Sequence, residues 1–171
     1  RIWRRHQPKF LIYAQDVLDL DEVVTRVNTA LFQDTLDNEF VTLFYGVIDP
    51  STMRMTYCNA GHDPPLLLRD GEIQKLTRGG MIVGVDAQQQ YEKGLITLQK
   101  GDLVLLYTDG LTDAQNFQCQ NFGLDRVIAA MCDRADMGAH DVLSHVLWEM
   151  RRFVGLNRSV DDTTLVTIRV K

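Results

Sequence analysis

The stretch "DLVLLYTDGLTDA", from Asp102 to Ala114, decides the fold of this chain. After Asp102 the residues are apolar or aromatic as far as Tyr107, which is typical of a buried strand. A carboxylate, Asp109, then stands at the strand end, and Gly110 follows it. A charge beside a buried strand is costly unless it is paired or bound to a cation. The stretch therefore predicts a buried strand with an aspartate at its C-terminal end.

A second pair of acids occupies an equivalent place near the end of the sequence. In "VDDTTLVTIRV", residues 160–170, Asp161 and Asp162 directly precede a predicted strand over 163–170. Aspartate oxygens are natural ligands of Mg²⁺ and Mn²⁺, and a divalent cation removes the repulsion between clustered carboxylates. If the two strand ends meet in space, they form a metal site. The alternative is an ordinary turn at Asp109-Gly110 and a solvated loop at Asp161-Asp162.

Periodicity along the rest of the chain indicates an α+β fold. Helical spacing predicts helices over 19–32, 123–135 and 140–155, and alternation predicts strands over 40–49 and 53–61. Further expectations are a hairpin turn at Asp70-Gly71, a flexible loop around Gly79-Gly80 and Gly84, and a strand pair across Lys100-Gly101 within residues 91–110. This order predicts helices covering a mainly antiparallel sheet, in one domain over residues 1–171.

The charge of the chain argues against some classes of partner. The formal net charge is −5 and the isoelectric point is about 5.3, which does not favour nucleic acid or an anionic membrane as the main partner. The basic residues at the start are too few to reverse this balance and are expected to be a solvated helix end: Arg1, Arg4, Arg5 and His6.

The cysteines and the hydropathy pattern favour a cytoplasmic protein. Cys58, Cys119 and Cys132 form no CxxC pair and predict reduced thiols rather than disulfides or a zinc site. No apolar run approaches the roughly 20 residues of a membrane span, and no signal peptide opens the sequence. We therefore expect no membrane partner.

Five segments, in order, resemble the SpoIIE-type metal-dependent serine/threonine phosphatases, the bacterial branch of the protein phosphatase 2C-like superfamily. They are "NEFVTLFYGVID" (38–49), "TYCNAGHDPPLLL" (56–68), "GGMIVGV" (79–85), "LQKGDLVLLYTDGLTDA" (98–114) and "VDDTTLVTIRV" (160–170). The resemblance covers essentially the whole chain and implies the α-β-β-α sandwich of that family.

The resemblance also assigns roles to the strand-end acids. Asp109 and Asp161 are implied to be direct ligands in a site for two Mn²⁺ or Mg²⁺ ions. Asp162 is implied to be either a ligand through water or a structural cap. Asp113 stands where the family usually has a glutamate, so it keeps the charge on a side chain that is one methylene shorter.

The family's Asn-Ala-Gly-His signature falls on a second group of residues. Asn59, Gly61 and His62 are expected to be structural or substrate-positioning, as is Gly110 in the Thr-Asp-Gly motif. His140 and His145 stand in helical contexts and are expected at the surface, and direct acid catalysis by His62 is the less favoured interpretation.

One motif of the family is not in the sequence. The Asp-x-x-Gly-His-Gly motif, whose aspartate bridges the two metal ions, would fall before Arg1. Three explanations stay open: this upstream part was removed, it is present but lacks order, or the protein is a natural variant that lost it. Without the bridging aspartate, the two-metal site would be incomplete, and the chain by itself is expected to be weakly active or inactive.

The implied reaction is hydrolysis of a phosphoserine or phosphothreonine ester by metal-activated water, without a covalent enzyme intermediate. The implied substrate is a phosphorylated anti-sigma-factor antagonist in a bacterial partner-switching or stress-response pathway. A sensor or response-regulator receiver domain is expected upstream, and a homodimer is compatible with the sequence. The alternative function is a catalytically degenerate, phosphatase-like adaptor that binds proteins in sigma-factor control.

Overall fold

A computed structural model describes residues 19–34, 40–157 and 161–171 of the 171-residue chain. These residues form two compact units. Unit 1 comprises 19–34, 40–64 and 76–98, and unit 2 comprises 65–75, 99–157 and 161–171. The basic cluster of residues 1–6 lies outside the described residues.

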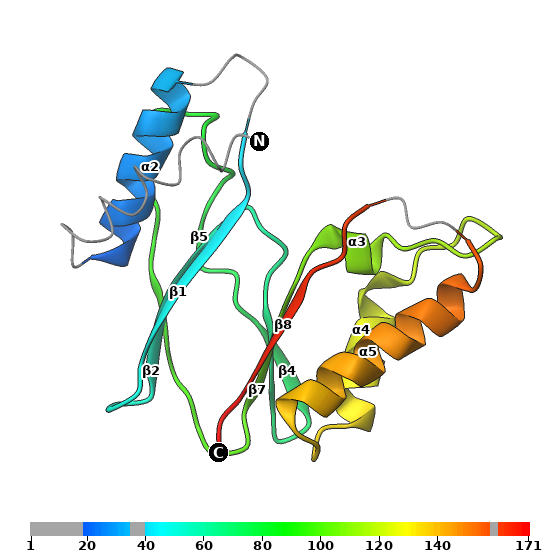
Figure 1. The fold of residues 1–171 in the computed structure, drawn as a ribbon. Helices are drawn as coiled ribbons and strands as arrows, with labels where there is room; N and C mark the ends of the chain where they lie inside the picture. Colours follow the sequence, from blue (N-terminus) through cyan, green and yellow to red (C-terminus); the bar gives the residue numbers. More distant parts are fainter. Residues whose placement is uncertain (1–18, 35–39, 158–160) are drawn as a thin grey trace. The chain divides into compact units, whose positions relative to one another are not determined.

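Unit 1 is a helix packed on a four-stranded sheet. The sheet contains β1 (Leu43–Asp49), β2 (Arg54–Ala60), β5 (Gly79–Gly80) and β6 (Gly94–Thr97), with β2 paired to the other three (Figure 1). The helix α2 (Leu20–Asp34) buries one apolar face in the core of this unit, through Leu20, Val23, Val24, Val27 and Leu31. Burial of this face removes apolar surface from water and holds the helix in place.

The turn between β1 and β2 is held by the side chain of Asp49. The Asp49 carboxylate accepts hydrogen bonds from the Ser51 amide at 2.8 Å, the Ser51 hydroxyl at 2.7 Å and the Thr52 hydroxyl at 2.8 Å. These bonds, led by the one from the Ser51 side chain, lower the pKa of Asp49 to about 2. The local bonding of one aspartate therefore sets this turn.

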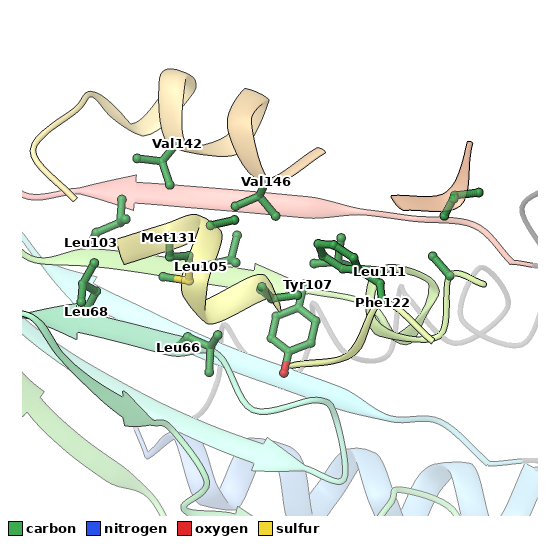
Figure 2. Close-up of a cluster of buried hydrophobic side chains, with 14 residues drawn as sticks. Leu66, Leu68, Leu103, Leu105, Tyr107, Leu111, Phe122, Met131, Val142 and Val146 are labelled. Atoms are coloured by element: carbon green, nitrogen blue, oxygen red, sulfur yellow. The ribbon is translucent and has the colours of Figure 1, made fainter. Parts of the chain in front are cut away.

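Unit 2 is an antiparallel sheet covered by two helices. The strands are β3 (Leu66–Arg69), β4 (Glu72–Lys75), β7 (Leu103–Tyr107) and β8 (Leu165–Arg169), in the order β4-β3-β7-β8. The short α3 (Asp109–Thr112) follows β7, and the two helices that cover the sheet are α4 (Gly123–Asp133) and α5 (Ala139–Val154). Figure 2 shows how Leu103, Leu105 and Tyr107 of β7 pack with Met131 of α4 and with Val142 and Val146 of α5.

The predicted strand pair within residues 91–110 is wrong. Both strands exist, but β6 pairs with β2 in unit 1, whereas β7 lies between β3 and β8 in unit 2. β7 is a largely buried strand whose two hydrogen-bonding edges are occupied by β3 and β8, so neither edge is left for β6. A tight turn at Lys100-Gly101 is thus not sufficient evidence for a hairpin.

Two smaller expectations also need correction. Gly79-Gly80 is not a flexible loop, since it forms β5 and pairs in parallel with Asn59 and Ala60. His145 is not a surface residue, because only 14% of its side chain is exposed. Its Nε2 lies 3.0 Å from the Asp133 carboxylate, and its ring stacks on Trp148.

The α+β class with mainly antiparallel sheets covered by helices is confirmed within each unit. The predicted turn at Asp70-Gly71 is also confirmed, and both residues have positive φ, as the commonest two-residue hairpin turn requires. Across the described ranges 19–34, 40–157 and 161–171, no helix is long and apolar enough to cross a membrane.

Candidate functional site

The two predicted strand ends meet, because β7 and β8 are neighbours. Tyr107 pairs with Leu165, and the contact continues past both strands through Thr108. The Thr108 amide donates to the Thr164 carbonyl at 3.1 Å, and the Thr108 hydroxyl accepts from the Thr164 amide at 3.0 Å. The same hydroxyl donates to the Asp162 carbonyl at 3.2 Å. The Asp162 backbone is therefore bonded to the residue that directly precedes Asp109.

Gly110 lets the two segments approach closely. A Cβ atom at this position would lie 2.5 Å from the Asp162 carbonyl oxygen and 2.9 Å from its carbonyl carbon. The Thr163 hydroxyl also donates to the Gly110 carbonyl at 3.0 Å. Asp109-Gly110 is thus not an ordinary turn: it begins α3, and the glycine is needed because the Asp162 backbone passes directly over it.

The acids of this region face solvent. Asp109, Asp113, Asp161 and Asp162 are all exposed. The Asp162 amide donates to the Asp161 carboxylate at 2.7 Å, which fixes one oxygen of that group. Four acids near two bonded strand ends form a negative region that a cation would stabilise.

A depression of about 300 Å³ lies at this end of unit 2. It is lined by Gly110, Asp113, Ala114, Gln115, Asn121 and Asp161. The Asn121 side-chain amide donates to the Asp113 carboxylate at 3.2 Å. Asp113 lies four residues after Asp109, and Asp161 directly precedes the last strand region. The two acids are distant in the sequence but line the same depression.

The chemistry of these groups fits a hard divalent cation. Exposed aspartate oxygens match the ligands of Mg²⁺ and Mn²⁺, whereas Zn²⁺ sites usually include histidine or cysteine. Within the part of the chain that the structure describes, however, no group of three or more histidine, cysteine, aspartate or glutamate residues could hold a metal ion. A metal site that used the strand-end acids would therefore need ligands beyond those that the described residues bring together.

The Asn-Ala-Gly-His signature lies in unit 1, at the end of β2. Asn59 is buried; its side chain accepts from the His62 amide at 2.8 Å and donates to the Leu76 carbonyl at 3.3 Å. Gly61 has a φ of 71°, and a Cβ there would lie 2.2 Å from the Ile82 side chain. The His62 Nδ1 lies 3.2 Å from the Thr42 hydroxyl. These contacts hold the turn after β2 together, and a role in substrate positioning stays a prediction.

The three cysteines are free thiols, as expected. Burial, and secondarily the charge of Asp21, raises the pKa of the Cys58 thiol to about 12, so this thiol is protonated at neutral pH and is a poor nucleophile. Cys119 and Cys132 are exposed.

Some residues around the acids could not be identified from the sequence. Thr108 and Thr163 each donate a hydrogen bond to a backbone carbonyl more than 50 residues away in the sequence. Asn121 donates a hydrogen bond to the Asp113 carboxylate. The one available signal was their position next to the two strand-end motifs.

Comparison with known proteins agrees with the sequence and the fold. Residues 10–171 match the sequence model of the family described as stage II sporulation protein E (SpoIIE). The chain is 30% identical over 131 residues to protein IcfG of Synechocystis sp., covering 75% of this chain and 20% of IcfG. It is 26% identical over 155 residues to the phosphoserine phosphatase RsbU of Bacillus subtilis, covering 88% of this chain and 45% of RsbU. The chain thus spans less than half of each relative.

Among solved structures, the PP2C phosphatase domain of SpoIIE from Bacillus subtilis, with a fragment of its regulatory domain, superimposes with a TM-score of 0.79. The sequence identity is 17%, and the match covers 99% of this chain and 49% of that structure. The fold of this chain is therefore the fold of the PP2C-type phosphatase domains. Because the family match extends over almost all of its residues, the chain belongs to the SpoIIE family.

Proposed function

We propose that this chain is the later and larger part of a metal-dependent protein serine/threonine phosphatase domain. The observation that carries the proposal is the cross-bonding of the β7 and β8 ends, which brings the exposed acids Asp109 and Asp161 to one edge of the sheet. Membership of the SpoIIE family and similarity to RsbU, a phosphoserine phosphatase, support the same activity.

In this proposal Asp109 and Asp161 hold Mn²⁺ or Mg²⁺, and Asp162 holds it through water or acts as a cap. When bound, the metal supplies charge for the phosphate and lowers the pKa of a water molecule. Thr108 and Gly110 fix the first carboxylate relative to the second. Asp113, oriented by Asn121, lines the depression that the phosphoester enters.

The proposed substrate is a phosphorylated regulatory protein of the anti-sigma-factor antagonist type. The depression is open at the surface of unit 2, and a phosphoserine on the surface of another protein could reach acids that are themselves exposed. A sensor or receiver domain in the same protein would control the activity.

Asp109→Asn in the full-length protein tests the proposal. Loss of a metal ligand removes several kcal/mol of charge stabilisation in the transition state, so Mn²⁺-dependent hydrolysis of p-nitrophenyl phosphate and of a phosphoserine peptide should fall by about 10³-fold or more. Asp136→Asn, which makes the same change at an exposed residue between α4 and α5, is the matched control and should keep its activity. Hydrolysis by Asp109→Asn at the unsubstituted rate would show that Asp109 is not a ligand.

The adaptor function is the second candidate, and one observation favours it. The described residues bring no three metal-ligating side chains together. Calorimetric titration of the full-length protein with Mn²⁺ separates the candidates. Binding that is lost in Asp109→Asn supports the phosphatase, whereas no binding by the unsubstituted protein supports the adaptor.

A further inference from the structure

The loop that joins α3 to α4 has a fixed shape. Gln115 and Asn121 form a β-bridge at its base, and the Gln115 side-chain amide donates to the Asn121 side chain at 3.0 Å. Inside the loop, the Asn116 carboxamide oxygen accepts from the Gln118 amide at 2.9 Å and from the Gln120 amide at 3.0 Å. The loop therefore satisfies its own backbone groups and presents its tip in a defined position.

The tip carries an apolar side chain into solvent. Phe117 is 71% exposed and Leu156, just past the end of α5, is 94% exposed; these are the two most exposed large apolar side chains among the residues described. The Asn157 carboxamide donates to the Gln115 carbonyl at 3.0 Å and the Asn116 carbonyl at 3.2 Å, which joins the α5 end to the loop (Figure 1). We call Phe117 and Leu156 the Phe117 patch.

The loop that carries Phe117 also forms part of the wall of the depression. Gln115 and Asn121, the two residues at the base of the loop, line the depression together with Asp113 and Asp161. A polypeptide whose phosphorylated side chain entered the depression would therefore extend across the loop. Phe117 and Leu156 do not themselves line the depression, so the patch would contact the polypeptide and not the phosphoester group.

The side chains around the patch indicate the kind of partner. The loop "QNFQCQN", residues 115–121, carries no charge, and residues with amide side chains flank Phe117 in the sequence. An anionic membrane would be bound by lysine or arginine. The loop has neither, and Arg152 in the last turn of α5 is paired with Glu149. An exposed aromatic residue inside an uncharged, hydrogen-bonding rim is instead the composition of a protein–protein contact centre.

We propose that the Phe117 patch binds an apolar side chain of the phosphoprotein substrate, near its phosphorylated residue, and so selects among phosphoproteins. The inference rests on the proposed phosphatase function. It adds a specificity determinant outside the strand-end acids, and it predicts that the sequence around the phosphoserine affects the rate.

The test measures kcat/KM of the full-length protein, with Mn²⁺, for a series of phosphoserine peptides. One leucine is moved stepwise through an otherwise polar peptide, on both sides of the phosphoserine. Burial of a leucine favours binding, so the best leucine position should be hydrolysed about tenfold faster than the all-polar peptide. The ratio of kcat/KM for the best leucine peptide to kcat/KM for the all-polar peptide should fall to near one in Phe117→Ser. In Phe117→Leu most of this ratio should remain.

Trp148→Ser is the matched control. Trp148 is also an exposed aromatic residue of unit 2, at 53%, but it lies on α5 against Arg152 and does not belong to the loop whose base lines the depression. Its substitution should leave the ratio unchanged, and Leu156→Ser should reduce it. Because the test compares a ratio of two kcat/KM values, a loss of activity that is common to both peptides cancels. Thermal unfolding checks that each variant is folded.

Three results would overturn the inference: no preference for any leucine position in the unsubstituted protein, a preference that survives Phe117→Ser, or an equal loss in Trp148→Ser. Failure of the proposed function is distinct, since the unsubstituted protein would then hydrolyse neither p-nitrophenyl phosphate nor any peptide. That result would overturn both proposals.

Discussion

An aspartate stands at each end of β7, and the two carboxylates differ in burial and in hydrogen bonding. Asp102, just before the strand, is 1% exposed, and its carboxylate accepts from Arg69 at 2.8 and 2.6 Å and from the Gln99 amide at 2.8 Å. Asp109, just after the strand, is exposed, and no described residue donates a hydrogen bond to its carboxylate. The acids stand seven positions apart in one strand region.

The difference separates a structural acid from a candidate ligand. Burial alone would raise the pKa of Asp102, but the hydrogen bonds from Arg69 and Gln99, together with the Arg69 charge, lower it below its ordinary value. The oxygens of Asp102 are thus already used by the protein and cannot bind a cation. Those of Asp109 are available, which is the property that a metal ligand needs.

The largest effect on stability is expected for Asp102→Ala. The change removes the two hydrogen bonds between the Asp102 carboxylate and the Arg69 guanidinium. Because the Arg69 side chain is only 28% exposed, water replaces these bonds incompletely. Breaking such a pair should lower the free energy of unfolding by about 3 kcal/mol. Urea denaturation measures this, with Asp136→Ala as an exposed control that should change it by less than about 0.5 kcal/mol. A loss below about 1 kcal/mol for Asp102→Ala would contradict the structural role.

The same pair should give a defined pH dependence. Because the pKa of Asp102 is lower in the folded protein than in the unfolded chain, its stabilising charge is fully present above the unfolded value of about 3.9. The contribution is lost as the pH falls through the folded pKa. The difference in unfolding free energy between the unsubstituted protein and Asp102→Asn should therefore shrink below about pH 4. A difference that stays constant down to pH 2 would mean that packing, and not charge, stabilises this end.

A smaller loss is expected at the other end for Gly110→Ala. The added methyl group would meet the Asp162 backbone, which cannot turn away as a side chain could, and the start of β8 must shift. We expect a loss of about 1–3 kcal/mol in stability together with reduced Mn²⁺-dependent hydrolysis. Gly138→Ala is the control, since its nearest neighbour is the movable Asp141 carboxylate at 3.3 Å. Full activity in Gly110→Ala would show that the distance between the strand ends does not matter.

The comparison also shows how far the sequence leads. The apolar run after Asp102 predicted β7 correctly, and the exposed acid at its far end could be identified because charge follows an abrupt change in hydropathy. The partner of Asp102 could not be identified, because Arg69 lies 33 residues away and periodicity reports burial but not pairing. For the same reason the false β6–β7 hairpin followed from a local turn signal.

The candidate site was predicted in outline and not in its contacts. The meeting of Asp109 with Asp161 and Asp162 was stated as a condition, and the β7–β8 pairing fulfils it. The roles of these acids as metal ligands stay predictions. The hydrogen bonds of Thr108 and Thr163 depend on the three-dimensional path of the backbone, which no local pattern encodes.

The smallest effect on stability is expected for Asp109→Asn, and it decides whether the two ends of β7 differ. Without added metal, its unfolding free energy should change by less than about 0.5 kcal/mol, because the exposed carboxylate leaves no buried partner behind. Mn²⁺ should raise the unfolding temperature of the unsubstituted full-length protein and not that of the variant, since a ligand that binds only the folded state stabilises it. A metal-free loss as large as that of Asp102→Ala would make Asp109 a second structural acid. Equal shifts with Mn²⁺ in both proteins would place the metal elsewhere.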